Sequence, residues 1–85
     1  MVAKTNNPLK LDQRTLTVAE LYAIWEFTDW TIPQIFEAFA TGLGAEHPGF
    51  VLALCLIEAK RANPEATIVD AGSMRYLELA TDDDS

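Results

Sequence analysis

The first regular pattern along the chain is a run of apolar residues at helical spacing that begins after a threonine. Thr17 and Glu20 form a capping box, in which a hydroxyl and a carboxylate three residues apart each accept a hydrogen bond from the other residue's backbone N–H. The helix that they start is predicted to end near Thr28 and Asp29. At 100° per residue its expected buried stripe is Val18, Leu21, Tyr22 and Trp25, flanked by Ile24, with Glu20, Ala23 and Glu26 facing solvent.

A second amphipathic helix is predicted to begin directly after the first. Thr31 and Gln34 repeat the capping spacing, and Pro33 lies in the first turn, where its missing N–H leaves no helical bond unmade. This helix is expected to end near Ala40. Its expected buried face is Ile32, Ile35, Phe36 and Phe39, and its expected outer face is Gln34, Glu37 and Ala38.

The third helix differs from the first two because it is apolar in every direction. It is predicted to run from about Pro48 or Gly49 to Ala62, after a loop over residues 41–49 that holds three of the four glycines. Residues 50–57 are all apolar, and a helix that is apolar all round belongs inside a protein. We therefore expect this helix to lie at the centre of the fold.

A short fourth helix is predicted to follow. Thr67 and Asp70 give its capping box. Gly72-Ser73 either ends this helix or bends it. The candidates for a final turn against the core are Met74, Tyr76 and Leu77.

These elements predict an all-α fold, a small single-domain bundle of three to five short helices around a central apolar helix. A chain of 85 residues has room for one domain. We expect an irregular N-terminal segment over residues 1–16, a helical domain over residues 17–80 and an acidic tail over residues 81–85.

The excess of acidic residues makes nucleic acids and anionic membranes unfavourable partners. The chain carries 13 acidic and 6 basic residues, a formal net charge of −7, which repels nucleic-acid phosphates and anionic membranes. Its start has no apolar run of signal-peptide length, and the run Phe50–Ile57 is far too short to cross a membrane. One cysteine cannot form an internal disulfide. We expect a soluble intracellular protein with no nucleic-acid and no membrane partner.

The residues with reactive side chains are few and dispersed. Cys55 lies in the middle of the apolar run, where burial would raise the pKa of its thiol and leave it inert. His47 lies in the glycine-rich loop and is expected to be solvated, because one imidazole beside Glu46 is too small a set to hold a metal. The run Asp82–Asp84 lacks the spacing of a calcium loop. We therefore predict no catalytic residue, no cofactor and no metal site. A small enzyme or a metal-binding protein ranks third, after the two non-catalytic hypotheses given below.

Aromatic side chains are crowded into one part of the sequence. Seven of the eight aromatic residues are Tyr22, Trp25, Phe27, Trp30, Phe36, Phe39 and Phe50. The residues assigned to the core are Trp25, Phe36, Phe39 and Phe50. Phe27 projects away from the expected buried stripe, and Trp30 lies just past the helix end. Either the two form an exposed apolar patch that marks a partner or self-association surface, or the N-terminal segment covers them through Leu9 and Leu11. The candidate partner-binding residues are Phe27, Trp30 and Tyr22.

With these residues in view, the chain resembles the small tail assembly chaperones of long-tailed bacteriophages. The resemblance rests on the capped segment Leu16–Leu21, on the apolar helix that ends in Glu58–Thr67 with its basic pair and Asn-Pro, and on Val69-Asp70. It extends from Leu16 to Leu79. The stretch Trp25–Trp30 departs from the family pattern, in which a glycine is expected near the end of the first helix.

The resemblance implies a function without chemistry. Chaperones of this family are helical proteins of the host cytoplasm that bind the long tape-measure protein, keep it soluble and help to recruit tail-tube subunits. It further implies a homo-oligomer that is absent from the finished particle. The main alternative is a small structural subunit of the particle, for decoration or connection, which would use the same surface features with a permanent partner.

Overall fold

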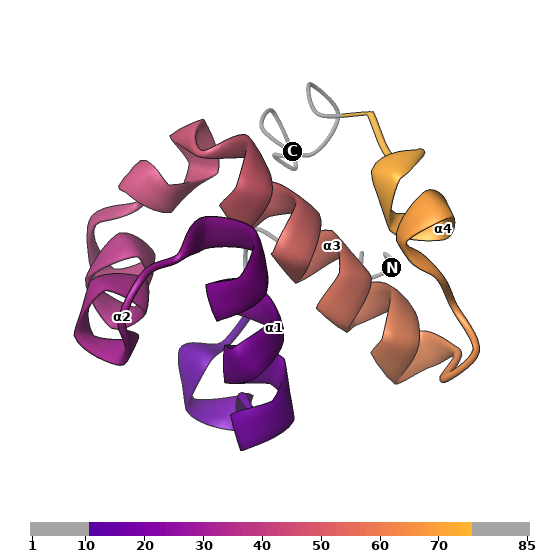
Figure 1. The fold of residues 1–85 in the computed structure, drawn as a ribbon, viewed down its shortest axis with the longest axis horizontal. Coiled ribbons are helices and arrows are strands. Elements are labelled where there is room, and N and C mark those ends of the chain that lie inside the picture. Colours follow the sequence, from indigo (N-terminus) through magenta and orange to yellow (C-terminus); the bar gives the residue numbers. More distant parts are fainter. Residues whose placement is uncertain (1–10, 76–85) are drawn as a thin grey trace, which may run out of the picture.

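The computed structural model describes residues 11–75, and these residues form helices and turns without a strand (Figure 1). The elements in chain order are the 3-10 turn η2 (Gln13–Thr15), α1 (Val18–Thr28), α2 (Ile32–Thr41), the 3-10 turn η3 (Leu43–Glu46), α3 (Pro48–Ala62) and α4 (Ile68–Gly72). The predicted all-α fold is confirmed. The residues predicted to restart a turn at Tyr76 and Leu77, and the acidic tail, lie outside the described residues.

The helix starts fall where the capping patterns placed them. In α1 the Glu20 N–H donates to Thr17 Oγ1 over 3.1 Å, and the Thr17 N–H donates to Glu20 Oε1 over 2.9 Å. Thr67 and Asp70 repeat this exchange at α4. At α2 the Thr31 N–H donates to the side chain of Gln34 over 2.8 Å. Three of the four helix starts are therefore set by local hydrogen bonds that the sequence makes recognisable.

The helix α3 is the centre of the molecule, with α1 and α2 on one side of it and α4 on the other (Figure 1). Its first buried face contributes Phe50, Ala53, Leu54 and Ile57 to a core shared with Leu11, Ile24, Ile35 and Ala38. Its second buried face contributes Val51 and Cys55 to a smaller cluster with Ala71 of α4. The prediction of a central apolar helix is confirmed, because burial on two faces needs apolar residues on two faces.

The predicted rotation of α1 about its own axis is wrong. The stripe expected to be buried is largely exposed, with Val18 at 82%, Tyr22 at 59% and Trp25 at 46% of their full exposure, whereas Ile24 and Thr28 are buried. The physical reason is that α1 is apolar on most of its circumference, so its pattern defines no single face. Packing against α3 uses the Ile24 side, where small and polar neighbours allow the helices to approach.

A smaller correction applies to the second helix and to the segment after the fourth. In α2 the buried residues are Ile35 and Ala38, while Ile32 and Phe36 are exposed. Ala38 was expected to face solvent. A methyl side chain has no strong preference for solvent or core, and its small size suits a close contact.

The open question of how α4 ends is also answered. Met74 lies in a non-helical stretch, so Gly72 ends α4 instead of bending it.

The connection between α1 and α2 is fixed by hydrogen bonds. Thr28 Oγ1 donates to the Ile24 carbonyl over 2.7 Å and accepts from the Trp30 N–H over 3.1 Å. Asp29 follows in the left-handed conformation, at φ 65°, which is the position where a glycine is common. These contacts hold α1 and α2 at a set angle across a connector of three residues.

Candidate binding groove

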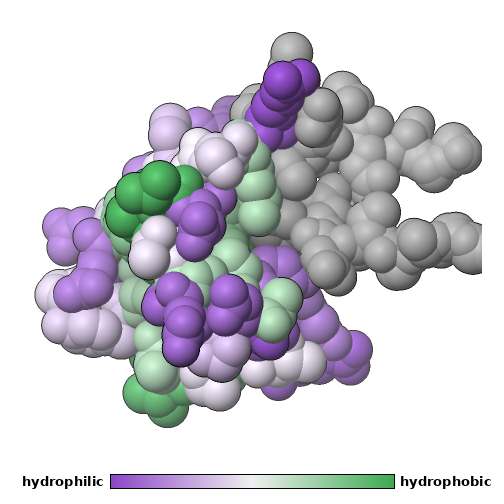
Figure 2. Space-filling model, turned by 90° about the vertical axis from the view of Figure 1, so that its right-hand side faces the viewer, coloured by the Kyte–Doolittle hydropathy of each residue, from purple (hydrophilic) through white to green (hydrophobic). Residues whose placement is uncertain are grey.

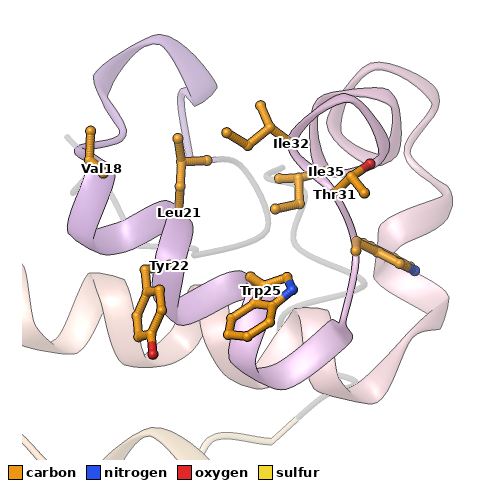
Figure 3. Close-up of a pocket in the computed structure, with 8 residues that line it drawn as sticks. Val18, Leu21, Tyr22, Trp25, Thr31, Ile32 and Ile35 are labelled. Carbon is orange, nitrogen blue, oxygen red and sulfur yellow. The ribbon is translucent and has the colours of Figure 1, made fainter.

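An apolar groove of about 460 Å³ lies between α1 and α2. It is lined by Val18, Leu21, Tyr22, Trp25, Trp30, Thr31, Ile32 and Ile35. In Figure 3 the side chain of Leu21 on α1 lies across from Ile32 and Ile35 on α2, and the two aromatic rings of α1 continue the groove along that helix. We call this feature the α1–α2 groove.

The groove has a buried base and an exposed rim. Ile35 is fully buried, and Leu21 and Trp30 are half-buried. Val18 and Ile32 are exposed at the rim. A continuous apolar surface that is open to water costs free energy, and in proteins such surfaces mark sites of interaction.

The rings of Tyr22 and Trp25 form a tilted pair on the exposed side of α1. Their centroids are 5.4 Å apart, with the planes tilted by 37°. Rigid aromatic side chains of this kind supply large contact areas at a low cost in conformational entropy, which is why they are enriched at interaction hot spots. The pair is therefore the part of the groove best suited to anchor another molecule.

The structure places the three candidate partner-binding residues in different surroundings. Tyr22 lies at the rim of the α1–α2 groove. Phe27 and Trp30 are half-buried and pack against the main core, which favours the covered alternative over the exposed patch. Leu11 belongs to the same core, as the covering alternative expected, while Leu9 lies outside the described residues.

Trp30 both packs against the main core and is one of the residues that line the α1–α2 groove. The centroid of its ring lies 4.7 Å from that of the His47 imidazole, in an edge-to-face arrangement, and 5.4 Å from that of the Phe50 ring. The sequence did not single out six of the eight groove residues as partner-binding: Val18, Leu21, Trp25, Thr31, Ile32 and Ile35. The feature of the sequence that could have identified those on α1 is that α1 is apolar on most sides. When one apolar face of such a helix is buried in the core, another apolar face remains exposed.

The aromatic core residues were predicted with mixed success. Phe50 is buried, and Phe39 is half-buried with its ring 5.1 Å from that of Phe50. Phe36 and Trp25 were expected in the core as well, but both are exposed. The difference follows from helix rotation, because each of these two residues lies on the side of its helix that α3 does not cover.

His47 is not a solvated loop residue. Its Nδ1 accepts hydrogen bonds from the backbone N–H groups of Gly49 and Phe50, over 3.1 and 3.3 Å, and so caps α3. Helix caps are usually recognised in sequences by a hydroxyl, carboxylate or amide side chain at this position. An imidazole nitrogen that carries no proton can accept the same backbone hydrogen bonds. The role of His47 is thus structural.

Cys55 is buried in the small cluster between α3 and α4, as predicted. Burial raises the pKa of its thiol above the ordinary value, so the reactive thiolate is disfavoured. Among residues 11–75 no three histidine, cysteine or acidic side chains gather as a metal site would require. None of the helices described is both long enough and apolar enough to cross a membrane.

A second hollow, of about 380 Å³, lies between α1 and the end of α3 and has a charged edge. Arg61 forms an ion pair with Glu20 at 2.8 Å and also donates to the Thr15 carbonyl over 3.0 Å. The hydrogen bond from Arg61 lowers the pKa of the Glu20 carboxyl. Because these charges satisfy each other, the hollow presents no free charge from this pair to a ligand.

Comparisons of the chain with models of known protein families, with curated proteins and with solved structures give no match.

Proposed function

We propose that this protein is a non-catalytic chaperone of the phage tail assembly type, which binds a tape-measure protein through the α1–α2 groove and keeps it soluble. The observation that carries the proposal is the exposed apolar groove, with the paired rings of Tyr22 and Trp25 at its rim. The assignment to tail assembly rests on the resemblance of the capped helices and the Glu58–Thr67 segment. Recruitment of tail-tube subunits is part of the same proposal.

The shape and lining of the groove suit a helical client. An amphipathic helix docks by placing side chains at positions i, i+3, i+4 and i+7 into an apolar groove. The walls of this groove come from two helices whose connector is fixed by the hydrogen bonds of Thr28. A groove that already has its final shape loses little entropy when the client binds.

The rest of the molecule suits the same role. A net charge of −7 on a chain of 85 residues keeps a complex with an apolar client soluble. On the side of α4, where described residues are visible, the most hydrophobic side chains stand apart among hydrophilic ones (Figure 2). This face offers a control surface for experiments on the groove.

The direct test is co-expression with the tape-measure protein that the proposal names as the client. We expect the client to be soluble and to co-purify with the wild-type protein, and both effects to be lost with Ile32→Ser. The matched control is Ile68→Ser. Both isoleucines are the first residue of a helix after a capping threonine, and they are similarly exposed, at 53% and 45%.

Two results would contradict the proposal. The first is a client whose solubility does not depend on this protein. The second is the presence of many copies of the chain in purified particles, which would favour the decoration or connector subunit instead.

The control variant tests the location of the binding site separately. Equal loss of client binding in both isoleucine variants would show that the groove is not the binding site.

A further inference from the structure

Every charged side chain on α1, on α2 and on the connector between them is acidic. Glu26 and Asp29 are exposed, and each lies about one helical turn beyond a groove ring, Glu26 beyond Tyr22 and Asp29 beyond Trp25. The backbone N–H of Asp29 donates to the Trp25 carbonyl, and Asp29 is the residue that caps the end of α1. No lysine or arginine occurs between Arg14 and Lys60, so neither helix of the groove supplies a cation.

The aromatic pair and the two carboxylates together form a surface that suits a positive side chain. An ammonium or guanidinium group within about 6 Å of a Tyr or Trp ring is attracted by the ring face. A carboxylate beside the ring adds an ion pair to the same cation. Tyr22 and Trp25 are both exposed, so part of each side chain is accessible to a partner.

A second copy of this chain does not fit the groove as well. Two grooves that face each other would bring Glu26 and Asp29 of both copies together. The segment between residues 14 and 60 holds no lysine or arginine to neutralise them. Like charges across an interface oppose association, so self-association is expected to use another surface.

We infer that the occupant of the groove is a client helix with an apolar stripe followed by Arg or Lys, whose cation lies on the Tyr22 and Trp25 rings beside Glu26 and Asp29. This inference rests on the proposed function and adds the chemical class of the client segment. The apolar stripe contacts Leu21, Ile32 and Ile35. The cation fixes the direction in which the helix lies in the groove.

The test uses synthetic 20-residue peptides that tile the tape-measure protein, with binding measured by fluorescence anisotropy at low and high salt. We expect the bound peptides to combine an apolar helical stripe with Arg or Lys, and to bind more weakly at high salt. The double variant Glu26→Gln, Asp29→Asn should lower their affinity about 3- to 10-fold, because partly exposed charge pairs contribute modestly. Asparagine also tolerates the left-handed backbone of residue 29.

A charge-matched control separates local contact from overall attraction. The double variant Glu37→Gln, Glu65→Gln removes the same charge from exposed sites, one of them on the side of α2 opposite Ile35. We expect it to leave the affinity nearly unchanged. In a bound peptide with its Arg and Lys replaced by Gln, the Glu26→Gln, Asp29→Asn variant should have no further effect.

The failures of the two proposals are distinguishable. Two results would overturn the inference and leave the proposed function standing, provided that the full-length client co-purifies. In the first, the bound peptides carry no Arg or Lys. In the second, they bind the Glu26→Gln, Asp29→Asn variant as tightly as the wild type. If neither the client nor any of its peptides binds, both are overturned.

Discussion

At the residue scale, His47 caps α3 with a ring nitrogen and packs against Trp30 with the edge of the same ring. The caps at Thr17, Thr31 and Thr67 could be predicted because threonine followed by an acid or amide three residues later is a local pattern. The His47 cap could not, since its geometry depends on the loop that carries it.

The first prediction concerns this cap. His47→Ala removes the acceptor for the Gly49 and Phe50 N–H groups, and we expect the free energy of unfolding to fall by about 1–2 kcal/mol. His47→Asn keeps an acceptor and should lose less. Urea denaturation followed by circular dichroism measures both. Equal stability of the alanine variant and the wild type would mean that the cap is not needed.

The second prediction concerns the close approach of two backbones beside that cap. A Cβ at Gly49 would collide with the Phe27 carbonyl and approach the His47 ring to 3.0 Å. We expect Gly49→Ala to destabilise the protein by about 1–3 kcal/mol. Gly72→Ala is the control, because its nearest neighbour would be Leu52 at an ordinary 3.8 Å. A Gly49→Ala protein that unfolds at the same urea concentration as the Gly72→Ala protein would disprove the close approach.

At the element scale, the helix boundaries and the burial of α3 on two faces could be predicted from sequence, whereas the face that α1 buries could not. Local hydrogen bonds set the boundaries of α1, whereas its rotation depends on what α3 presents to it. The stripe predicted to be buried was Val18, Leu21, Tyr22 and Trp25, of which Leu21 is half-buried and the other three are exposed. That face became the rim of the groove because the Ile24 face entered the core. The sequence therefore contained the groove residues without showing that they are exposed.

The third prediction concerns the ion pair that joins α1 to α3. The hydrogen bond from Arg61 lowers the pKa of Glu20 below its ordinary value of 4.5, so the folded state binds fewer protons than the unfolded state near that pH. The stabilisation is fully present above pH 4.5 and is lost as the pH falls through the lowered value.

Glu20→Gln keeps an acceptor for the Thr17 N–H and removes the charge. Because the pair is partly exposed, we expect this variant to lose less than about 1 kcal/mol at pH 7. The difference from the wild type should shrink as the pH falls from 5 to 3, as measured by urea denaturation at several pH values. A difference that stays constant over this range would rule out the ion pair as its cause.

At the scale of the whole molecule, one helix that is apolar on all sides organises the fold and leaves the outer face of α1 uncovered. A small domain has few elements with which to cover every apolar face. In this protein α3 is covered from both sides, by α1 on one and α4 on the other. Part of the apolar surface that remains exposed forms the α1–α2 groove, and this groove is the basis of the proposed function.

The central claim is that the client contacts the exposed rim of the α1–α2 groove, and the fluorescence of Trp25 tests it most directly. The chain has two tryptophans, so Trp30→Phe leaves Trp25 as the single emitter, and Trp25→Phe leaves Trp30. Adding the tape-measure client should shift the Trp25 emission to shorter wavelength and protect it from acrylamide, with a smaller change at the half-buried Trp30. A client that binds while the emission and quenching of Trp25 stay unchanged would contradict the claim.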